Sequence, residues 1–148
     1  MQPLKRKFLL ADDDADDASL FCEALNRIAP VLECTTVENG VELFELLSQR
    51  ISDKPDVIFL DINMPIMNGW ESLRKLKEDK EYKSIPTIMY STSSAKKDIE
   101  TAYRLGALLF VTKPEDFVEL TTILEIVATS SQDSVVSRLK GFESVKLN

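Results

Sequence analysis

The sequence predicts an α/β protein in which parallel strands form one sheet with helices on both of its faces. Three observations support this fold class. Short apolar runs alternate five times with segments of helical spacing, which is typical of parallel strands joined by helical crossovers. Residues 57–60 are apolar without a break, as in a strand buried on both faces. The length of 148 residues suits one ordinary domain.

The individual elements follow from local patterns in chain order. Strands are expected at residues 8–11, 31–37, 57–60, 87–90 and 108–111. Helices are expected where apolar residues recur at helical spacing, at about 15–28, 41–51, 70–76, 96–105 and 117–128. Pro30 ends the first helix, and Gly106 is a natural residue just past the end of the fourth. Each strand is thus followed by a helix.

Charge and hydropathy exclude several classes of function. The net charge is -7 and the sequence pI is about 4.7, so nucleic acid is not an expected partner, because phosphate binding needs a basic face. The basic group Lys5, Arg6 and Lys7 is interpreted as a solvated segment before the first strand. No apolar run has the length of a membrane span, and no signal peptide is recognised. We therefore expect a cytoplasmic protein without a membrane partner.

The inventory of reactive side chains is narrow. Cys22 and Cys34 are the only cysteines, and the chain has no histidine. This excludes a zinc site and a Cys/His nucleophile pair. Both cysteines are interpreted as small buried apolar groups in a reducing compartment.

Polar residues follow four of the predicted strands. Asp12 and Asp13 follow the first strand, Asp61 the third, Ser91 the fourth and Lys113 the fifth. The carboxyl ends of parallel strands lie at one edge of the sheet, where ligands bind in folds of this type. We therefore expect these side chains to share one site.

Three carboxylates in one site need a cation. Two charges about 4 Å apart repel by roughly 4 kcal/mol at an effective dielectric constant of about 20. Oxygen ligands without sulfur or imidazole suit Mg²⁺ or Mn²⁺. Asp61 is then a candidate nucleophile for a phosphoryl group, with Lys113 and Ser91 as partners of the phosphoryl oxygens.

Other readings remain open at this point. Asp14, Asp16 and Asp17 are interpreted as caps of the first helix that favour its dipole. A phosphohydrolase with an aspartyl-phosphate intermediate is a rival function, although Asn63 stands where such enzymes carry a second aspartate as the general acid. A scaffold that is never phosphorylated is a third possibility.

The residues together resemble the response-regulator receiver domain. The resemblance rests on residues 8–14 with their Asp pair, on Leu60-Asp61-Ile62-Asn63-Met64-Pro65 with Gly69, on Ser91, and on Gly106-Ala107 with Lys113-Pro114. It implies a flavodoxin-like, doubly wound, five-stranded parallel sheet of order 2-1-3-4-5 with five helices in three α/β/α layers. The receiver domain would span residues 5–128. The tail, 129–148, is expected to be part helical, since Val135, Leu139 and Phe142 share a helical face.

The resemblance also implies a role for each site residue. Asp61 would be the phosphoacceptor, with Ser91 and Lys113 binding the phosphoryl group. Asp13, Asp61 and the backbone carbonyl of Asn63 would ligate Mg²⁺, and Asp12 would act through water. Ser91 and Phe110 would be the switch residues, and the Lys113-Pro114 bond is expected to be cis.

The expected function is that of a stand-alone response regulator in two-component signalling. It would take a phosphoryl group from a histidine kinase, a phosphotransfer protein or a small phosphodonor with Mg²⁺. It would act on a downstream protein target through the face formed by residues 95–105 and 108–111. It is not expected to be an enzyme beyond slow loss of its own phosphate.

Overall fold

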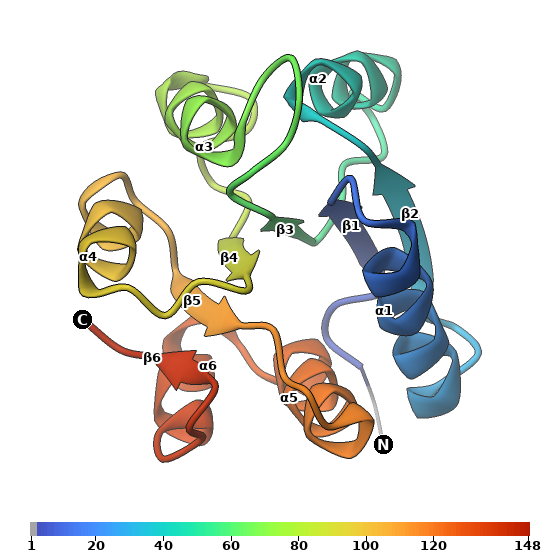
Figure 1. Ribbon diagram of the computed structural model, residues 1–148. Coiled ribbons are helices and arrows are strands. Elements are labelled where there is room, and N and C mark those ends of the chain that lie inside the picture. The colour runs from blue at the N-terminus through green and yellow to red at the C-terminus, as the bar shows by residue number, and fades with distance from the viewer. Residues whose placement is uncertain (1–2) are drawn as a thin grey trace.

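A sheet of six strands runs through the middle of the molecule, between two layers of helices (Figure 1). The computed structural model describes residues 3–148. The strands are β1 (Lys7–Ala11), β2 (Glu33–Val37), β3 (Val57–Leu60), β4 (Thr87–Ser91), β5 (Leu109–Thr112) and β6 (Val145–Lys146). The helices are α1 (Ala15–Ile28), α2 (Gly40–Gln49), α3 (Gly69–Glu78), α4 (Lys96–Arg104), α5 (Phe117–Thr129) and α6 (Gln132–Leu139).

The strand order confirms the predicted topology and extends it. The order is β2-β1-β3-β4-β5-β6, and the pairs among the first five strands are all parallel. β6 pairs antiparallel with β5 at the edge of the sheet. The order reverses at β1 and β3, which makes this the switch point where ligands bind in doubly wound folds.

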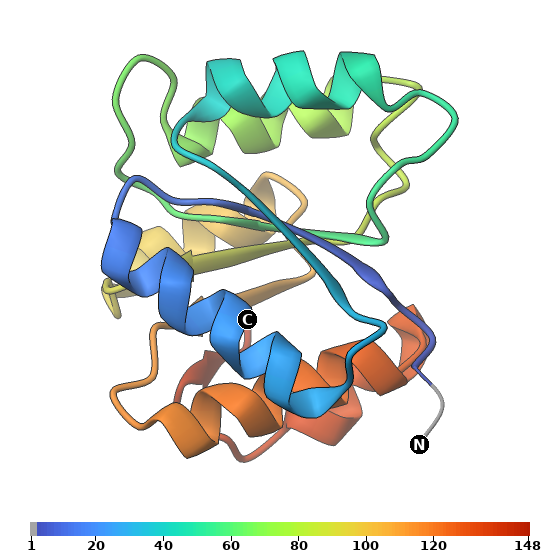
Figure 2. The same cartoon turned by 90° about the vertical axis from the view of Figure 1, so that its right-hand side faces the viewer.

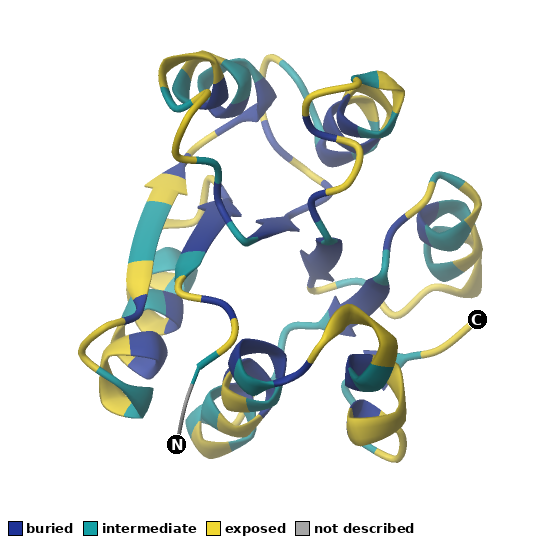
Figure 3. Ribbon diagram, turned by 180° about the vertical axis from the view of Figure 1, so that it is seen from behind, coloured by how far each residue is buried: buried dark blue, intermediate teal, exposed yellow. Residues whose placement is uncertain are grey.

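Alternating side chains of the strands build two cores, one on each face of the sheet. Phe8 and Leu10 point to one face, where they pack with buried residues of α1, α5 and α6. Leu9 and Ala11 point to the other face and pack with α2, α3 and α4. Figure 2 shows these two helix layers edge-on. Every residue of β3 and β4 is buried (Figure 3), so their positions are fixed by packing on both sides.

The second strand and second helix are shorter than predicted. β2 begins at Glu33, and Val31 is 48% exposed in the preceding turn. α2 ends at Gln49, so Ile51 lies beyond it and is 64% exposed. Both residues are apolar, and their spacing predicted that they belong to a strand and a helix. In the fold neither side chain packs against the core, so the two elements stop short of them.

The segment after α5 folds back onto the sheet. The side chains of Val135 and Leu139 in α6 are buried in the core under α1 and α5. Past α6, β6 pairs Val145 with Val111 and Lys146 with Phe110. The chain thereby covers the edge of β5 that would otherwise be free.

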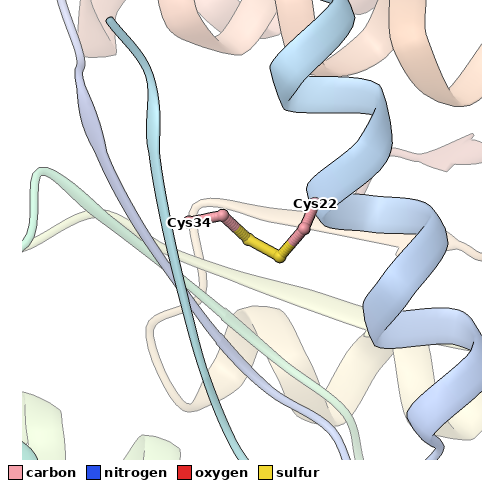
Figure 4. Close-up of a disulfide and its surroundings, with 2 residues drawn as sticks. All are labelled: Cys22 and Cys34. Carbon is pink, nitrogen blue, oxygen red and sulfur yellow. A yellow bond between two sulfur atoms is a disulfide. The ribbon is translucent and has the colours of Figure 1, made fainter. Parts of the chain in front are cut away.

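A disulfide joins α1 to β2. Cys22 and Cys34 are bonded with an S–S distance of 2.08 Å and a Cα–Cα distance of 5.6 Å (Figure 4). The prediction of two reduced, buried cysteines is therefore wrong. The two residues are only half-buried, and the helix lies beside the edge strand closely enough for a bond of ordinary span.

Lys5 is also not the solvated residue that the sequence suggested. Its side chain is buried, and its ammonium donates to the carbonyl of Ser130 at 2.6 Å and to that of Val127 at 3.4 Å. These carbonyls belong to the end of α5, where unpaired acceptors and the helix dipole favour a cation. Lys5 therefore ties the start of the chain to the end of α5.

Candidate functional site

The sheet brings the predicted site residues to one edge. Asp12 follows β1, Asp61 follows β3, and Lys113 follows β5, while Ser91 is the last residue of β4. Backbone bonds hold these strand ends in register: the Asp61 N–H donates to the Ala11 carbonyl at 2.9 Å, and the Lys113 N–H donates to the Ser91 carbonyl at 2.7 Å. The common edge follows from the parallel pairing of the four strands.

Three carboxylates meet at the switch point between β1 and β3. One oxygen each of Asp12, Asp13 and Asp61 lies within 4.8 Å of the other two. The residues Asp12 and Asp61 are buried, at 2% and 8% exposure, whereas Asp13 is exposed. The cluster therefore has two buried members and one exposed member.

The carboxylate cluster fits a hard divalent cation. Asp12 Oδ2 is buried and makes no hydrogen bond of good geometry within residues 3–148. It lies 2.8 Å from the Lys113 ammonium, so this contact is an ion pair by distance only. A buried carboxylate oxygen that lacks a directed partner costs free energy, and a metal ion would complete its coordination. Oxygen-only ligands favour Mg²⁺ or Mn²⁺ over softer metals.

The Asp61 carboxyl group has a raised pKa in this site. Burial raises the pKa of Asp61 to about 6, the Lys113 ammonium opposes this shift, and the nearby Asp12 carboxylate adds to it. Its Oδ1 accepts a hydrogen bond from the backbone N–H of Ile62 at 2.8 Å. A cation at the cluster would favour the ionised, nucleophilic form of this carboxylate.

Lys113 is shared among three carboxylates. Its Nζ lies 2.8 Å from Asp12 Oδ2, 2.8 Å from Asp17 Oδ2 and 3.4 Å from Asp61 Oδ2. Burial alone would lower the pKa of Lys113, but the adjacent Asp12, Asp17 and Asp61 carboxylates outweigh it and raise that pKa. The ammonium is therefore charged throughout the physiological range.

Asp17 was missed as part of the site by sequence reasoning, which assigned it to the helix cap. The cap is Asp14, whose carboxylate accepts from the Asp17 backbone N–H at 3.0 Å. The Asp17 side chain is thus free to reach Lys113, which is 96 positions away in the chain. No local spacing signals a pair this distant.

Ser91 is the last residue of β4, and Phe110 lies within β5. The Ser91 hydroxyl accepts a hydrogen bond from the Ser93 N–H at 3.1 Å. Phe110 is fully buried in the core beneath α4, and its N–H donates to the Tyr103 hydroxyl at 3.2 Å. Their switch roles stay predictions.

The loop after Asp61 is shaped by Gly69. A Cβ at Gly69 would lie 2.1 Å from the Asp61 carbonyl oxygen, so only glycine allows α3 to begin this close to the end of β3. Asn63 lies exposed in this loop, and its carbonyl as a metal ligand stays a prediction. Across residues 3–148 no peptide bond is cis. The expected cis Lys113-Pro114 bond is therefore wrong for this structure, in which it has the trans form favoured at most X-Pro bonds.

Comparison with known proteins resolves the family. Residues 8–125 match the family described as the response regulator receiver domain. The chain belongs to this family. The matched range contains the Asp pair, Asp61, Ser91 and Lys113. Receiver domains are phosphoacceptors in two-component signalling, which is the general function of this chain, and a phosphohydrolase is not favoured.

Similar proteins agree with this assignment. The chemotaxis protein CheY1 of Helicobacter pylori is 34% identical over 123 residues, which cover 82% of this chain and 95% of CheY1. The crystal structure of the phosphorylated cyanobacterial phytochrome response regulator RcpA has a TM-score of 0.75 and 30% identity, and covers 90% of this chain and 96% of RcpA. The Mn²⁺-bound response regulator Rcp1 has a TM-score of 0.69 and 26% identity, with 95% and 97% coverage.

The comparisons also indicate the general chemistry of the receiver. Receiver domains bind divalent metal, and they interact with histidine kinases and with downstream targets. Some relatives that contain a receiver are enzymes. One is a protein-glutamate methylesterase of Methanococcoides burtonii, of which this chain covers only 32%. The receiver itself is a phosphoacceptor and not an enzyme in the usual sense.

Proposed function

We propose that Asp61 is the residue that accepts the phosphoryl group in this receiver. The observation that carries the proposal is the position of its carboxylate, which lies in one cluster with Asp12 and Asp13 and 3.4 Å from the Lys113 ammonium. A nucleophilic carboxylate needs cationic groups beside it to offset the charge of the incoming phosphoryl oxygens. Lys113 supplies one of these charges.

The transfer step is a displacement at phosphorus. A carboxylate oxygen of Asp61 forms a bond to the phosphorus of the donor, and the bond from phosphorus to the donor breaks. With acetyl phosphate the electron pair of that bond leaves on acetate; with a phosphohistidine it leaves on the imidazole nitrogen. Lys113 pairs with the phosphoryl oxygens during the step, and no atom is oxidised or reduced.

A divalent cation is the proposed cofactor, Mg²⁺ with Mn²⁺ as a substitute. Asp12, Asp13 and Asp61 are the side chains that would hold it, with the Asn63 carbonyl as a further ligand. When bound, the ion supplies positive charge beside the phosphoryl oxygens. The buried, poorly paired Asp12 Oδ2 supports this proposal.

The proposed output passes from Ser91 to the face formed by α4 and β5. Ser91 would rotate its hydroxyl toward the phosphoryl group and give up the bond from the Ser93 N–H. The Ser93 carbonyl accepts from the Thr112 hydroxyl at 2.9 Å, and the Thr112 N–H donates to the Ser144 carbonyl at 2.8 Å. A shift of the Ser93 loop would therefore move Thr112 and, through it, the segment that leads into β6.

This route makes β6 part of the signalling face predicted at α4 and β5. β6 covers the edge of β5 with its two residues, Val145 and Lys146, so a downstream protein would meet β6 before it met β5. Phe110 lies in β5 directly opposite Lys146. Repacking of the Phe110 side chain would therefore shift β5 and the β6 residues paired with it.

The proposed partners are a histidine kinase or a phosphotransfer protein and a downstream protein target, and the proposed location is the cytoplasm. Similarity to CheY1 supports both. No helix within residues 3–148 has the length and apolar character needed to cross a membrane. A disulfide is uncommon in cytoplasmic proteins. Trapping the thiols of Cys22 and Cys34 in intact cells tests the location, because a fully bonded pair would argue against it.

Labelling by acetyl phosphate with Mg²⁺ tests the proposed function. The wild type should gain the mass of one phosphoryl group, and Asp61→Asn should gain none, because an amide cannot form the acyl phosphate. Asp56→Asn is the matched control, since Asp56 is another acidic residue close to β3, at its opposite end, where it accepts from the N–H groups of Arg6 and Lys7. Equal labelling of Asp61→Asn and the wild type would remove Asp61 from the role.

A further inference from the structure

Asp17 makes a contact that neither the family match nor the helix cap explains. Its Oδ2 lies 2.8 Å from Lys113 Nζ, as near as Asp12 Oδ2 and nearer than Asp61 Oδ2 at 3.4 Å. The Lys113 side chain is 9% exposed and that of Asp17 is 33% exposed. The pair is therefore a partly buried ion pair at the rim of the site.

The fold holds this pair in place. α1 and α5 lie side by side on one face of the sheet (Figure 2), which sets the first turns of α1 beside the loop between β5 and α5. Asp14 caps the helix, so the Asp17 carboxylate is not needed at the helix end. The preceding acidic residue, Asp16, is exposed, and within residues 3–148 it forms no ion pair with Lys113.

Lys113 donates hydrogen bonds to Asp17 and Asp61 and lies at ion-pair distance from Asp12. A lysine side chain has three N–H donors, and three acidic residues lie around Lys113 at hydrogen-bonding or ion-pair distance. A phosphoryl group on Asp61 would bring further oxygens to the same nitrogen. One of the present partners must then share the ammonium or release it. Asp17, which is the most exposed of the three side chains, is the one that can move away at the lowest cost.

We propose that Asp17 is a positioning residue that holds Lys113 in the unphosphorylated state and competes with the phosphoryl group for it. The inference rests on the proposed function, since it needs a phosphoryl group on Asp61. With Asp17 charged and bound, the site is more negative and Lys113 is partly engaged, so both uptake and retention of phosphate are weakened. The competition sets how readily this receiver is labelled by a small phosphodonor.

The test compares labelling kinetics of Asp17→Asn, Asp16→Asn and the wild type with acetyl phosphate and Mg²⁺. Asp17→Asn should lower the half-saturating acetyl phosphate concentration roughly threefold or more, because a negative charge close to the anion site is removed. The half-life of the phosphorylated form should also lengthen, because Lys113 is then free to pair with the phosphoryl oxygens. Asp17→Glu, which keeps the charge, should stay near the wild type.

Asp16→Asn is the matched control, because it makes the same change in net charge one residue away without touching Lys113. If Asp17 has only a structural role, Asp17→Asn would change the melting temperature. Its half-saturating acetyl phosphate concentration and its phosphate half-life would then equal those of Asp16→Asn. That result, or a raised half-saturating concentration in Asp17→Asn, would overturn the inference while leaving the proposed function intact. A wild type that takes up no phosphate would overturn both.

Discussion

The hydroxyl of Tyr103 donates a hydrogen bond of 2.6 Å to the backbone carbonyl of Lys146, and so joins α4 to β6. The same hydroxyl accepts from the N–H of Phe110 at 3.2 Å. Burial raises the pKa of Tyr103, and the hydrogen bond from Phe110 opposes that shift. One side chain therefore links α4, β5 and the edge strand β6 at the proposed signalling face.

Replacing Tyr103 by phenylalanine should loosen β6. The change removes both hydrogen bonds and leaves two backbone groups to find new partners, so we expect a loss of about 1–3 kcal/mol in the free energy of unfolding. Amide hydrogen exchange should accelerate in residues 144–148 and remain unchanged in β1 and β3.

Tyr82→Phe is the control for this variant. Tyr82 is buried in the core on the face of the sheet covered by α2, α3 and α4, and its ring centroid lies 6.2 Å from that of Phe44. It loses the same hydroxyl without reaching β6. Equal rates of amide hydrogen exchange in residues 144–148 of the two variants would show that the Tyr103 hydroxyl does not hold β6.

The positions of the acids and the lysine could be predicted from sequence because each follows a buried apolar run. In a parallel sheet such positions share one edge, and Asp12, Asp61 and Lys113 do meet there. Contacts without a local pattern could not be predicted. The two residues of β6 are too few to show a period, and the Asp17–Lys113 pair spans most of the chain.

The cysteines and Lys5 show a second limit. Two cysteines 12 positions apart carry no signal of bonding unless the packing of α1 against β2 is known. Lys5 appeared solvated because it stands in a basic group, yet the end of α5 offers it two carbonyl acceptors. In both cases the partner was supplied by tertiary structure and not by neighbours in the chain.

The disulfide should stabilise the oxidised protein. It closes a short loop, with Cys22 and Cys34 separated by 12 positions, and loops of this size gain about 2–3 kcal/mol from the restricted unfolded chain. Dithiothreitol should therefore lower the melting temperature of the wild type. The double variant Cys22→Ser with Cys34→Ser should melt near the reduced wild type and be insensitive to the reagent. Two free thiols in the purified, unreduced protein would contradict the bond.

Stabilisation by Mg²⁺ should grow as the pH rises through about 6. Burial raises the pKa of Asp61 to about 6 in the folded protein, above its ordinary value of 3.8. The metal-free fold therefore binds the proton more tightly than the unfolded chain does, and this contribution to stability is lost as the pH rises from about 4 to 6. A metal ion needs the ionised carboxylate, so it competes with that proton.

Melting curves with and without Mg²⁺ measure this competition. They are recorded between about pH 5 and 8, a range in which Asp61 loses its proton. The gain in melting temperature should be small at the acidic end and largest at the alkaline end. Asp61→Asn should show a smaller gain with little change across the range, because an amide does not titrate. A gain in the wild type that is constant with pH would contradict the raised pKa of Asp61 as the cause.

The most direct test of the central claim is to locate the phosphate in the chain. Treatment of the acetyl phosphate-labelled protein with borohydride reduces an aspartyl phosphate to homoserine, and peptide mass spectrometry then reads the modified position. Homoserine at position 61, and its absence from positions 12, 13 and 17, is the predicted result. Modification at any of those three acids with position 61 unchanged would contradict the assignment of Asp61 as the phosphoacceptor.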